Sequence, residues 1–584
     1  MNFRATVILL LILALLGGYY YFYEVKFAAK QAKIEEDKKK LFLFSEQEVQ
    51  EVKLIGPEGT IVVKKSDGGW ALEEPIQAKA DDKAIEFLLS RLKTAQSDRS
   101  VDEGTPKLAD YGLVKPFLQV SFKLKDQPTY QTLYFGDLTP SELYVYAQKN
   151  VDPKIYLVDK FLRDDLNKKV FDLRDKTIVA FETDKVKKLE FVVDKNKMVA
   201  EASGGNWKVT QPGEYKGDKD KITSILTKLN FTKVKEFIEE NPEDLSKYGL
   251  DNPPIQVTLW VGDDMAQKTL LLGKSDESKK GIYAKREGSH NVFLVPDDLT
   301  KDFPKTVMDL RDKTVLAFEK GDIKKVQIQR EGMDLIAEKV SDKDWNLTQP
   351  EQVKADESAI SDVLTEVRGL KVKEFTHDNP SDLAAYGLNT PKIQVNLWEK
   401  DKENPKTLWV GKEEGSGVYV KTNESNSVYL VDSAIVKTLT KTPMDLRDKT
   451  LVSFNREDVE KITLKYPDKT FTFQKSGKEW RLVEPEKAKA KDWRVGNLLT
   501  DLQFLKFKEL VSTDQKPESD YGFDKPEVEI TLWKKGGEEI TTLILGKKTD
   551  NGLIYTRTKS GDTVYRIDAS FLQELPKSLE DVKA

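Results

Sequence analysis

The hexapeptide "DLRDKT" occurs three times in this chain, at residues 172–177, 309–314 and 445–450. The copies begin at residues 172, 309 and 445, so the steps between them are 137 and 136 residues. Regular spacing of this kind indicates that the chain is built from copies of one unit. A period near 137 is much longer than that of a solenoid repeat, so each copy has enough residues to bury its own core.

The same landmarks surround each hexapeptide in the same order. A tryptophan stands five residues before a proline in four places, and these pairs are Trp70 and Pro75, Trp207 and Pro212, Trp345 and Pro350, and Trp480 and Pro485. An apolar stripe with helical spacing follows each proline, as in Ile222, Ile225, Leu226 and Leu229. Helix caps are expected at Asp81, Asp218 and Asp356, with Lys491 as the exception.

A short Tyr-Gly element comes after each predicted helix and is followed by a proline. It begins at Tyr111, Tyr248, Tyr386 and Tyr521. We expect its glycine to end a short helix in a left-handed conformation. Alternating apolar residues then predict a half-buried strand, and the strand after it is expected to end at Gly136, Gly273, Gly411 or Gly546.

These patterns predict an α+β fold with four tandem homologous domains of about 137 residues, after an N-terminal transmembrane helix. Each domain is expected to have a mainly antiparallel sheet, one amphipathic helix and short helices. The predicted boundaries are a short N-terminal tail 1–4, a transmembrane anchor 5–23, a charged stalk 24–40, and repeats 41–177, 178–314, 315–450 and 451–584.

Taken together, the landmarks resemble a bacterial family that is named only as a domain of unknown function, DUF4340. The Trp-x4-Pro element, the single amphipathic helix and the Tyr-Gly-Leu element with its proline carry the likeness, which covers residues 41–581 in tandem. Members of this family typically have an N-terminal membrane span, and some are encoded beside components of gliding-type ABC transporters. The resemblance implies an accessory envelope protein and supplies no catalytic residue.

The N-terminus contains 19 residues without a charge, "ATVILLLILALLGGYYYFY" at 5–23. Such a helix would be about 28 Å long, which matches a bilayer core. A cleaved signal peptide is the alternative, but no small-residue cleavage site follows the run. Lys26, Lys30 and Lys33 favour a cytoplasmic body by charge counting, whereas the short tail before the span favours export. We expect a single-pass membrane protein with its body outside the cytoplasm, in the periplasm.

Composition narrows the function classes. The chain has 94 Lys plus Arg against 99 Asp plus Glu, a net charge of −5, which disfavours nucleic acid as a partner. It has no cysteine, and its two histidines, His290 and His377, occupy non-equivalent places and are interpreted as surface residues. We therefore expect no catalytic residue, no cofactor and no metal site.

The charged residues of the hexapeptides are candidates for an ion site or a structural role at the domain joints. They are Asp172, Arg174 and Asp175, then Asp309, Arg311 and Asp312, and then Asp445, Arg447 and Asp448. The structural interpretation, which we favour, is that each arginine bridges carboxylates or helix-end carbonyls across the boundary and sets the angle between neighbouring domains.

Three tryptophans form a predicted interaction surface. Trp260, Trp398 and Trp533 end the same predicted strand in the last three copies, where the first copy has Lys123. Strand alternation places them on the face opposite the buried set. An exposed tryptophan there can stack on a sugar ring or a partner protein, unless a helix or loop covers that face.

The leading hypothesis is a membrane-anchored, non-enzymatic scaffold or accessory protein outside the cytoplasm, as part of an ABC-type transport complex. Its partners would be the membrane, through the N-terminal helix, and other envelope or membrane proteins. The alternative is a protein that binds polysaccharide or cell wall through the three tryptophans. A hydrolase that works through carboxylates alone is a third hypothesis, which no constellation of residues supports.

Overall fold

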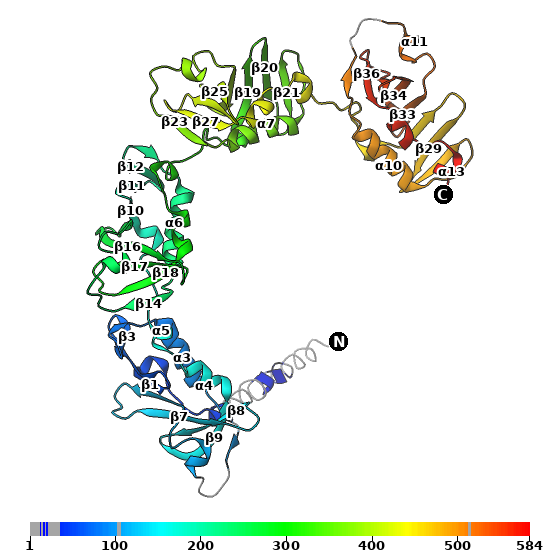
Figure 1. Ribbon diagram of the computed structural model, residues 1–584. Coiled ribbons are helices and arrows are strands. Elements are labelled where there is room, and N and C mark those ends of the chain that lie inside the picture. Colours follow the sequence, from blue (N-terminus) through cyan, green and yellow to red (C-terminus); the bar gives the residue numbers. More distant parts are fainter. Residues whose placement is uncertain are drawn as a thin grey trace. The chain divides into compact units, whose positions relative to one another are not determined.

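The computed structural model describes residues 12, 14, 16, 17, 19–21, 35–97, 99–101, 107–511 and 516–584. Within these residues the chain forms four sheets of nine strands each, and every strand pairing is antiparallel. The predicted fold of four tandem α+β domains is therefore confirmed, and we number the domains 1 to 4 along the chain (Figure 1). The chain divides after Asp312 into two compact units, one with domains 1 and 2 and one with domains 3 and 4.

Most of the predicted membrane anchor, 5–23, lies outside the described residues, and so do the tail 1–4 and the first part of the stalk. Residues 35–39 of the stalk are helical. Among the residues that the structure describes, no helix has both the length and the apolar character needed to cross a membrane.

Domain 1 shows the topology that all four domains share. Its strands are β1 (Val49–Gly56), β2 (Gly59–Ser66), β3 (Gly69–Glu74), β4 (Ala78–Lys79), β5 (Arg99–Ser100), β6 (Leu118–Leu124), β7 (Gln131–Leu138), β8 (Tyr144–Lys149) and β9 (Asp152–Asp159). Its helices are η2 (Glu46–Glu48), α3 (Asp82–Thr94), η3 (Leu108–Tyr111), α4 (Lys160–Leu166) and α5 (Val170–Leu173). The strand order is β4-β3-β2-β1-β6-β7-β8-β9-β5, so the chain passes through α3 between the two edge strands of the sheet.

Domain 2 repeats this order, from β13 at one edge to β14 at the other. Its strands are β10 (Val186–Val193), β11 (Asn196–Ser203), β12 (Asn206–Gln211), β13 (Tyr215–Lys216), β14 (Glu236–Glu239), β15 (Ile255–Val261), β16 (Ala266–Asp276), β17 (Gly281–Arg286) and β18 (Val292–Pro296). Its helices are η4 (Thr183–Lys185), α6 (Lys219–Phe231), η5 (Ser246–Tyr248), η6 (Asp297–Asp302) and η7 (Val307–Asp309).

Domain 3 has the same sheet order, from β22 to β23. Its strands are β19 (Ile323–Arg330), β20 (Met333–Lys339), β21 (Trp345–Gln349), β22 (Val353–Lys354), β23 (Glu374–His377), β24 (Ile393–Glu399), β25 (Lys406–Glu414), β26 (Gly417–Thr422) and β27 (Val428–Asp432). Its helices are η8 (Lys320–Asp322), α7 (Glu357–Gly369), η9 (Ala384–Tyr386), α8 (Ala434–Leu439) and α9 (Pro443–Leu446).

Domain 4 completes the series, with its sheet running from β31 to β32. Its strands are β28 (Lys461–Lys465), β29 (Thr470–Ser476), β30 (Glu479–Glu484), β31 (Ala488–Lys489), β32 (Glu509–Leu510), β33 (Val528–Trp533), β34 (Glu539–Lys548), β35 (Leu553–Thr558) and β36 (Tyr565–Asp568). Its helices are η10 (Arg456–Asp458), α10 (Asp492–Gln503), α11 (Glu518–Tyr521), α12 (Phe571–Glu574) and α13 (Leu579–Val582).

Each domain buries one face of its sheet under the long helix. The predicted helical stripe is buried in all four copies; in α6, for example, Ile222, Ile225, Leu226 and Leu229 are at most 1% exposed. The predicted aspartate caps accept hydrogen bonds from backbone N–H groups of the first turn, and Lys491 makes no side-chain cap. Local sequence thus specifies where the helix starts and which face is buried.

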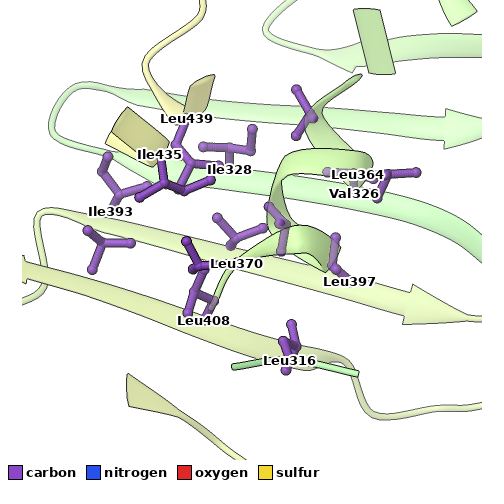
Figure 2. Close-up of a cluster of buried hydrophobic side chains, with 14 of the residues drawn as sticks. Leu316, Val326, Ile328, Leu364, Leu370, Ile393, Leu397, Leu408, Ile435 and Leu439 are labelled. Atoms are coloured by element: carbon purple, nitrogen blue, oxygen red, sulfur yellow. The ribbon is translucent and has the colours of Figure 1, made fainter. Parts of the chain in front are cut away.

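The core of domain 3 shows how distant segments meet beneath this helix. Figure 2 shows Leu364 of α7 beside Val326 of β19, and the closing helix α8 contributes Ile435 and Leu439 to the same cluster. Each of the other domains has a comparable cluster of its own. The tryptophans before the prolines belong to these cores, since Trp70, Trp207, Trp345 and Trp480 are 5 to 9% exposed. Every domain therefore has an independent hydrophobic core.

The Tyr-Gly glycines have the expected conformation. Gly112, Gly249, Gly387 and Gly522 lie in the left-handed region, with φ between +65° and +76°. A second set of glycines behaves differently from the prediction, because Gly136, Gly273, Gly411 and Gly546 lie inside strands β7, β16, β25 and β34 and do not end them. A Cβ at any of these positions would lie 2.0 to 2.2 Å from the carbonyl oxygen of the Tyr-Gly tyrosine. Close approach of two backbones, rather than a turn, requires glycine there.

Candidate functional site

Each hexapeptide is hydrogen-bonded to two domains. In the first copy the Asp175 N–H donates to the Lys79 carbonyl in domain 1 (2.9 Å), and the Val234 N–H of domain 2 donates to the Lys176 carbonyl (2.7 Å). In the second copy the equivalent bonds run from Asp312 to Lys216 and from Val372 to Lys313. In the third copy they run from Asp448 to Lys354 and from Phe507 to Lys449. The first four residues of the hexapeptide therefore belong to the preceding domain and the last two to the following one.

The aspartates at the start of the hexapeptides cap the N-terminal ends of short helices. The Asp172 carboxylate accepts a hydrogen bond from the Lys169 N–H (2.9 Å), and Asp445 accepts from the Thr442 N–H (2.7 Å). Asp309 accepts from the backbone at the same place in its own domain. These carboxylates complete helix caps, which accounts for their repetition without an ion.

The second aspartates are also engaged. Asp175 accepts from the Thr177 N–H and Asp448 from the Thr450 N–H, both at 2.9 Å. Each second aspartate, Asp312 included, also lies within 4.0 Å of the lysine that precedes the long helix of its domain. The pairs are Asp175 with Lys79, Asp312 with Lys216, and Asp448 with Lys354. In the described part of the chain there is no group of three or more acidic or histidine side chains placed to hold a metal ion.

The three arginines have different partners, although their surroundings in sequence are identical. Arg174 donates to both carboxylate oxygens of Glu240 in domain 2, at 2.5 and 2.8 Å, and its guanidinium lies 3.5 Å from the centroid of the Phe237 ring. Arg447 instead pairs at 3.3 Å with Glu351 of its own domain. The predicted bridge across the boundary is therefore observed for Arg174, while Arg447 makes its ion pair within domain 3.

The residue after the proline explains this difference. Domain 3 has Glu351 there and domain 4 has Glu486, which pairs with Lys583 (2.7 Å) at the position equivalent to Arg447. Domain 1 has Ile76 at this place, so Arg174 has no acidic neighbour there and its side chain reaches Glu240. In domain 2 the residue is glycine, and Arg311 stacks over Tyr215 at 3.9 Å.

The three candidate tryptophans lie on β15, β24 and β33 as predicted, but they are half-buried rather than exposed. A lysine of the neighbouring strand covers each ring, and the distances from its Nζ to the ring centroid are 4.8 Å for Lys188 and Trp260, 5.2 Å for Lys325 and Trp398, and 5.3 Å for Lys461 and Trp533. Strand register places each lysine directly opposite its tryptophan. A sugar ring would have to displace these lysines before it could stack.

The sequence matches the family described as "Domain of unknown function (DUF4340)" four times, at residues 70–205, 207–391, 345–479 and 480–584. The chain belongs to the DUF4340 family. No curated protein matches the sequence.

The DUF4340 matches are out of phase with the folded domains. Each match begins at the tryptophan of a Trp-x4-Pro element, in the third strand of a sheet, and the first one ends at Gly205, after the second strand of the next sheet. A unit cut at these limits would separate the first two strands of a sheet from the rest. In this DUF4340 chain the structural boundary instead lies within the hexapeptide.

Sequence reasoning missed two groups of residues in this DUF4340 chain. One is Glu240, the partner of Arg174; the other is Arg286 and Asn291, which face the same joint. The signal that could have found them is a departure from the repeat. By strand register, Arg286 stands where the other domains have Lys149, Thr422 and Thr558. His290, interpreted as a surface residue, is exposed and lies beside them.

Proposed function

We propose that the chain is a membrane-anchored, non-enzymatic accessory protein of the cell envelope, with its body outside the cytoplasm, which holds partner proteins of an ABC-type transport complex. The observation that carries this proposal is the series of four like domains, in which the joint inside each compact unit is hydrogen-bonded to both of its domains. Membership in DUF4340 is consistent with it, since the family has no assigned activity.

The joint inside each compact unit supports a scaffold, because it leaves no free linker between the two domains of that unit. Within the first unit, Asp175 is bonded to domain 1 and Lys176 to domain 2, so a single peptide bond separates the two attachments. Within the second unit the same holds for Asp448 and Lys449. A flexible linker would leave such domains free to diffuse, whereas a bonded joint restricts the angles between them.

The anchor is supported by the sequence alone. The uncharged run 5–23 is long enough to cross a bilayer, and its last five residues are all aromatic, as at a membrane interface. The single basic residue before it, Arg4, is typical of a short tail that stays in the cytoplasm while the following chain is exported.

Fusions at the C-terminus test the topology. Alkaline phosphatase attached after Ala584 should be active, because the enzyme folds only outside the cytoplasm, and a GFP fusion at the same place should be dark. The reverse pair of results would place the body in the cytoplasm and end this part of the proposal.

Crosslinking in cells tests the accessory role. The full chain should capture a membrane or envelope protein, and a chain that lacks residues 1–23 and is exported by a cleavable signal should not. Equal capture with and without the anchor would contradict the proposal.

Polysaccharide binding remains the second candidate, favoured only by the recurrence of tryptophan at one strand position. If it is correct, binding on a glycan array should be lost in Trp398→Ala and kept in Trp493→Ala, because Trp493 is 62% exposed but lies outside the recurring set. Unchanged binding in Trp398→Ala, or none by the parent chain, would eliminate it.

A further inference from the structure

A cavity of about 570 Å³ lies at the first joint, between domains 1 and 2. Domain 1 contributes the segment 75–79 with Arg174 and Asp175 of the hexapeptide, and domain 2 contributes Glu240, Asn241 and residues of the β17–β18 turn. Both domains belong to the same compact unit. The cavity is large enough for a ligand of monosaccharide size.

The acidic groups that line the cavity are already paired. Glu240 accepts two hydrogen bonds from Arg174. Asp175 accepts from the Thr177 N–H and lies 3.8 Å from Lys79 Nζ. Both oxygens of Glu240 accept donors of Arg174, and Asp175 lies between a backbone donor and Lys79, so neither carboxylate is hydrogen-bonded to Arg286.

Arg286 is the remaining cation of the cavity. Its guanidinium donates to the backbone carbonyls of Ile178, at 3.2 Å, and Thr177, and none of the ion pairs among the described residues includes it. Burial lowers the pKa of Arg286, and the attraction of Asp175 opposes this effect while Arg174 adds to it. A half-buried positive charge whose hydrogen bonds go to neutral carbonyls favours the arrival of an anion.

Asn291, which lines the same cavity, supplies an unpaired donor. The residue is 6% exposed, and its Nδ2 atom has no hydrogen-bond partner within the described chain. Its other amide atom, Oδ1, accepts a hydrogen bond from the Ser289 hydroxyl. Because an unpaired buried N–H group is costly, this donor is a binding group that awaits an acceptor.

We propose that the cavity binds a small hydroxylated monocarboxylate of sugar-acid size, whose carboxylate pairs with Arg286 and accepts from Asn291. The charges support one negative charge on the ligand: the lining has three cations, Lys79, Arg174 and Arg286, against two anions, Asp175 and Glu240. A dianion such as phosphate would exceed the single net positive charge of the lining. Hydroxyl groups of the ligand would meet Asn241 and the His290 ring, which also line the cavity.

The site is specific to this joint. Domains 3 and 4 have Thr422 and Thr558 in place of Arg286, and Ser427 stands in domain 3 in place of Asn291. The proposal therefore makes the boundary between domains 1 and 2 responsive to a ligand, while domains 3 and 4 have a neutral threonine at the position of Arg286. It does not depend on the membrane topology.

The two histidines of the chain give a direct test. The sample is the full-length protein in detergent, isotopically labelled only at histidine and observed by NMR. His290 borders the cavity, and His377, in β23 of domain 3, is the internal control. Added D-glucuronate should shift the His290 imidazole signal saturably and leave His377 in place. Neutral D-glucose should move neither signal. Inorganic phosphate should bind more weakly than glucuronate.

Variants then assign the binding groups. Arg286→Thr and Asn291→Ser introduce the residues of domain 3; the first should weaken glucuronate binding at least about tenfold and the second about fivefold. Arg330→Thr is the matched control, because Arg330 also donates to backbone carbonyls, those of Leu439 and Lys441, but in domain 3. It should leave the affinity unchanged.

Absence of a saturable His290 shift in the parent chain would overturn the proposal, whatever the variants do. Equal affinity in the parent and Arg286→Thr would overturn the assigned role of Arg286. Tighter binding of phosphate than of glucuronate would overturn the assignment of a monocarboxylate.

Discussion

Arg174 of domain 1 donates two parallel hydrogen bonds to Glu240 of domain 2, and this pair is a direct side-chain link across the first joint. The Arg174 side chain is 8% exposed and that of Glu240 38%. A bidentate pair in which one partner is buried is stronger than an ordinary surface ion pair. Its loss should therefore change the geometry of the joint.

Glu240→Gln should loosen this joint, because a neutral amide cannot provide two charged acceptors for Arg174. We expect a loss of about 1 to 2 kcal/mol of interaction between domains 1 and 2 and little change in the melting of either domain. The chain has no cysteine, so two introduced cysteines can carry spin labels in exposed turns of the two domains. Pulsed EPR should show a broader distance distribution in the variant.

Glu351→Gln is the control for this measurement. It removes the partner of Arg447 within domain 3, so the distribution between labels in domains 3 and 4 should stay as narrow as in the parent chain. Equal broadening in both variants would show that the Arg174 pair has no special role at its joint.

Gly273→Ala should destabilise domain 2 far more than Gly288→Ala. A Cβ on Gly273 would lie 2.1 Å from the Tyr248 carbonyl oxygen, whereas Gly288 has φ +76° and no atom within 4 Å of its added Cβ. We expect more than about 3 kcal/mol for Gly273→Ala, from the backbone clash, and about 1 kcal/mol for Gly288→Ala, from the left-handed backbone alone. Hydrogen exchange of domain 2 amides in denaturant measures both, and similar losses would refute the close-approach argument.

Asp356→Asn should remove a pH-dependent part of the stability of domain 3. Burial alone would raise the pKa of Asp356, but hydrogen bonds from Ser358 and Lys506 outweigh it and lower the pKa to about 2. Since this folded-state pKa lies below the unfolded value of about 3.9, the contribution is complete above pH 4 and is lost as the pH falls through 2. The variant should melt below the parent at pH 7, and the two melting temperatures should converge toward pH 2.

Lys506→Gln provides the matched partner variant. Lys506 Nζ lies 3.0 Å from the Asp356 carboxylate and comes from domain 4, so its removal should reduce the same pH dependence while the helix cap remains. A difference in melting temperature that is the same at every pH would contradict the assigned pKa.

A fragment of residues 176–312 should fold alone and be more stable than a fragment of residues 178–310. The longer fragment keeps the bridge between Thr177 and Lys233 and the hydrogen bond from Asp312 to Lys216, and the shorter one loses both. We expect cooperative melting of 176–312 at a temperature several degrees above that of 178–310. Failure of 176–312 to melt cooperatively would show that domain 2 depends on its neighbours.

Repetition and local periodicity determined much of this fold from the sequence alone. The four Trp-x4-Pro elements gave the number of domains, the three copies of "DLRDKT" gave their spacing, the apolar spacing in α6 gave the buried helix face, and Asp218 gave its start. These features depend on residues within a few positions of one another, where helical and strand geometry is fixed. The left-handed conformation of the glycine in the Tyr-Gly element is also determined by its immediate neighbours in the sequence.

Only the tertiary structure decided the rest, because it depends on residues far apart in the chain. Gly273 is required by the carbonyl of Tyr248, which reaches it through the fold, and so it lies inside a strand that the sequence predicted to end there. The arginines of identical hexapeptides have different partners because the residue after the Trp-x4-Pro proline differs. Glu351 in domain 3 pairs with Arg447, whereas Ile76 in domain 1 cannot pair with Arg174, which binds Glu240 instead. Likewise, Arg286 and Asn291 become a candidate site only where domain 2 meets the hexapeptide of domain 1.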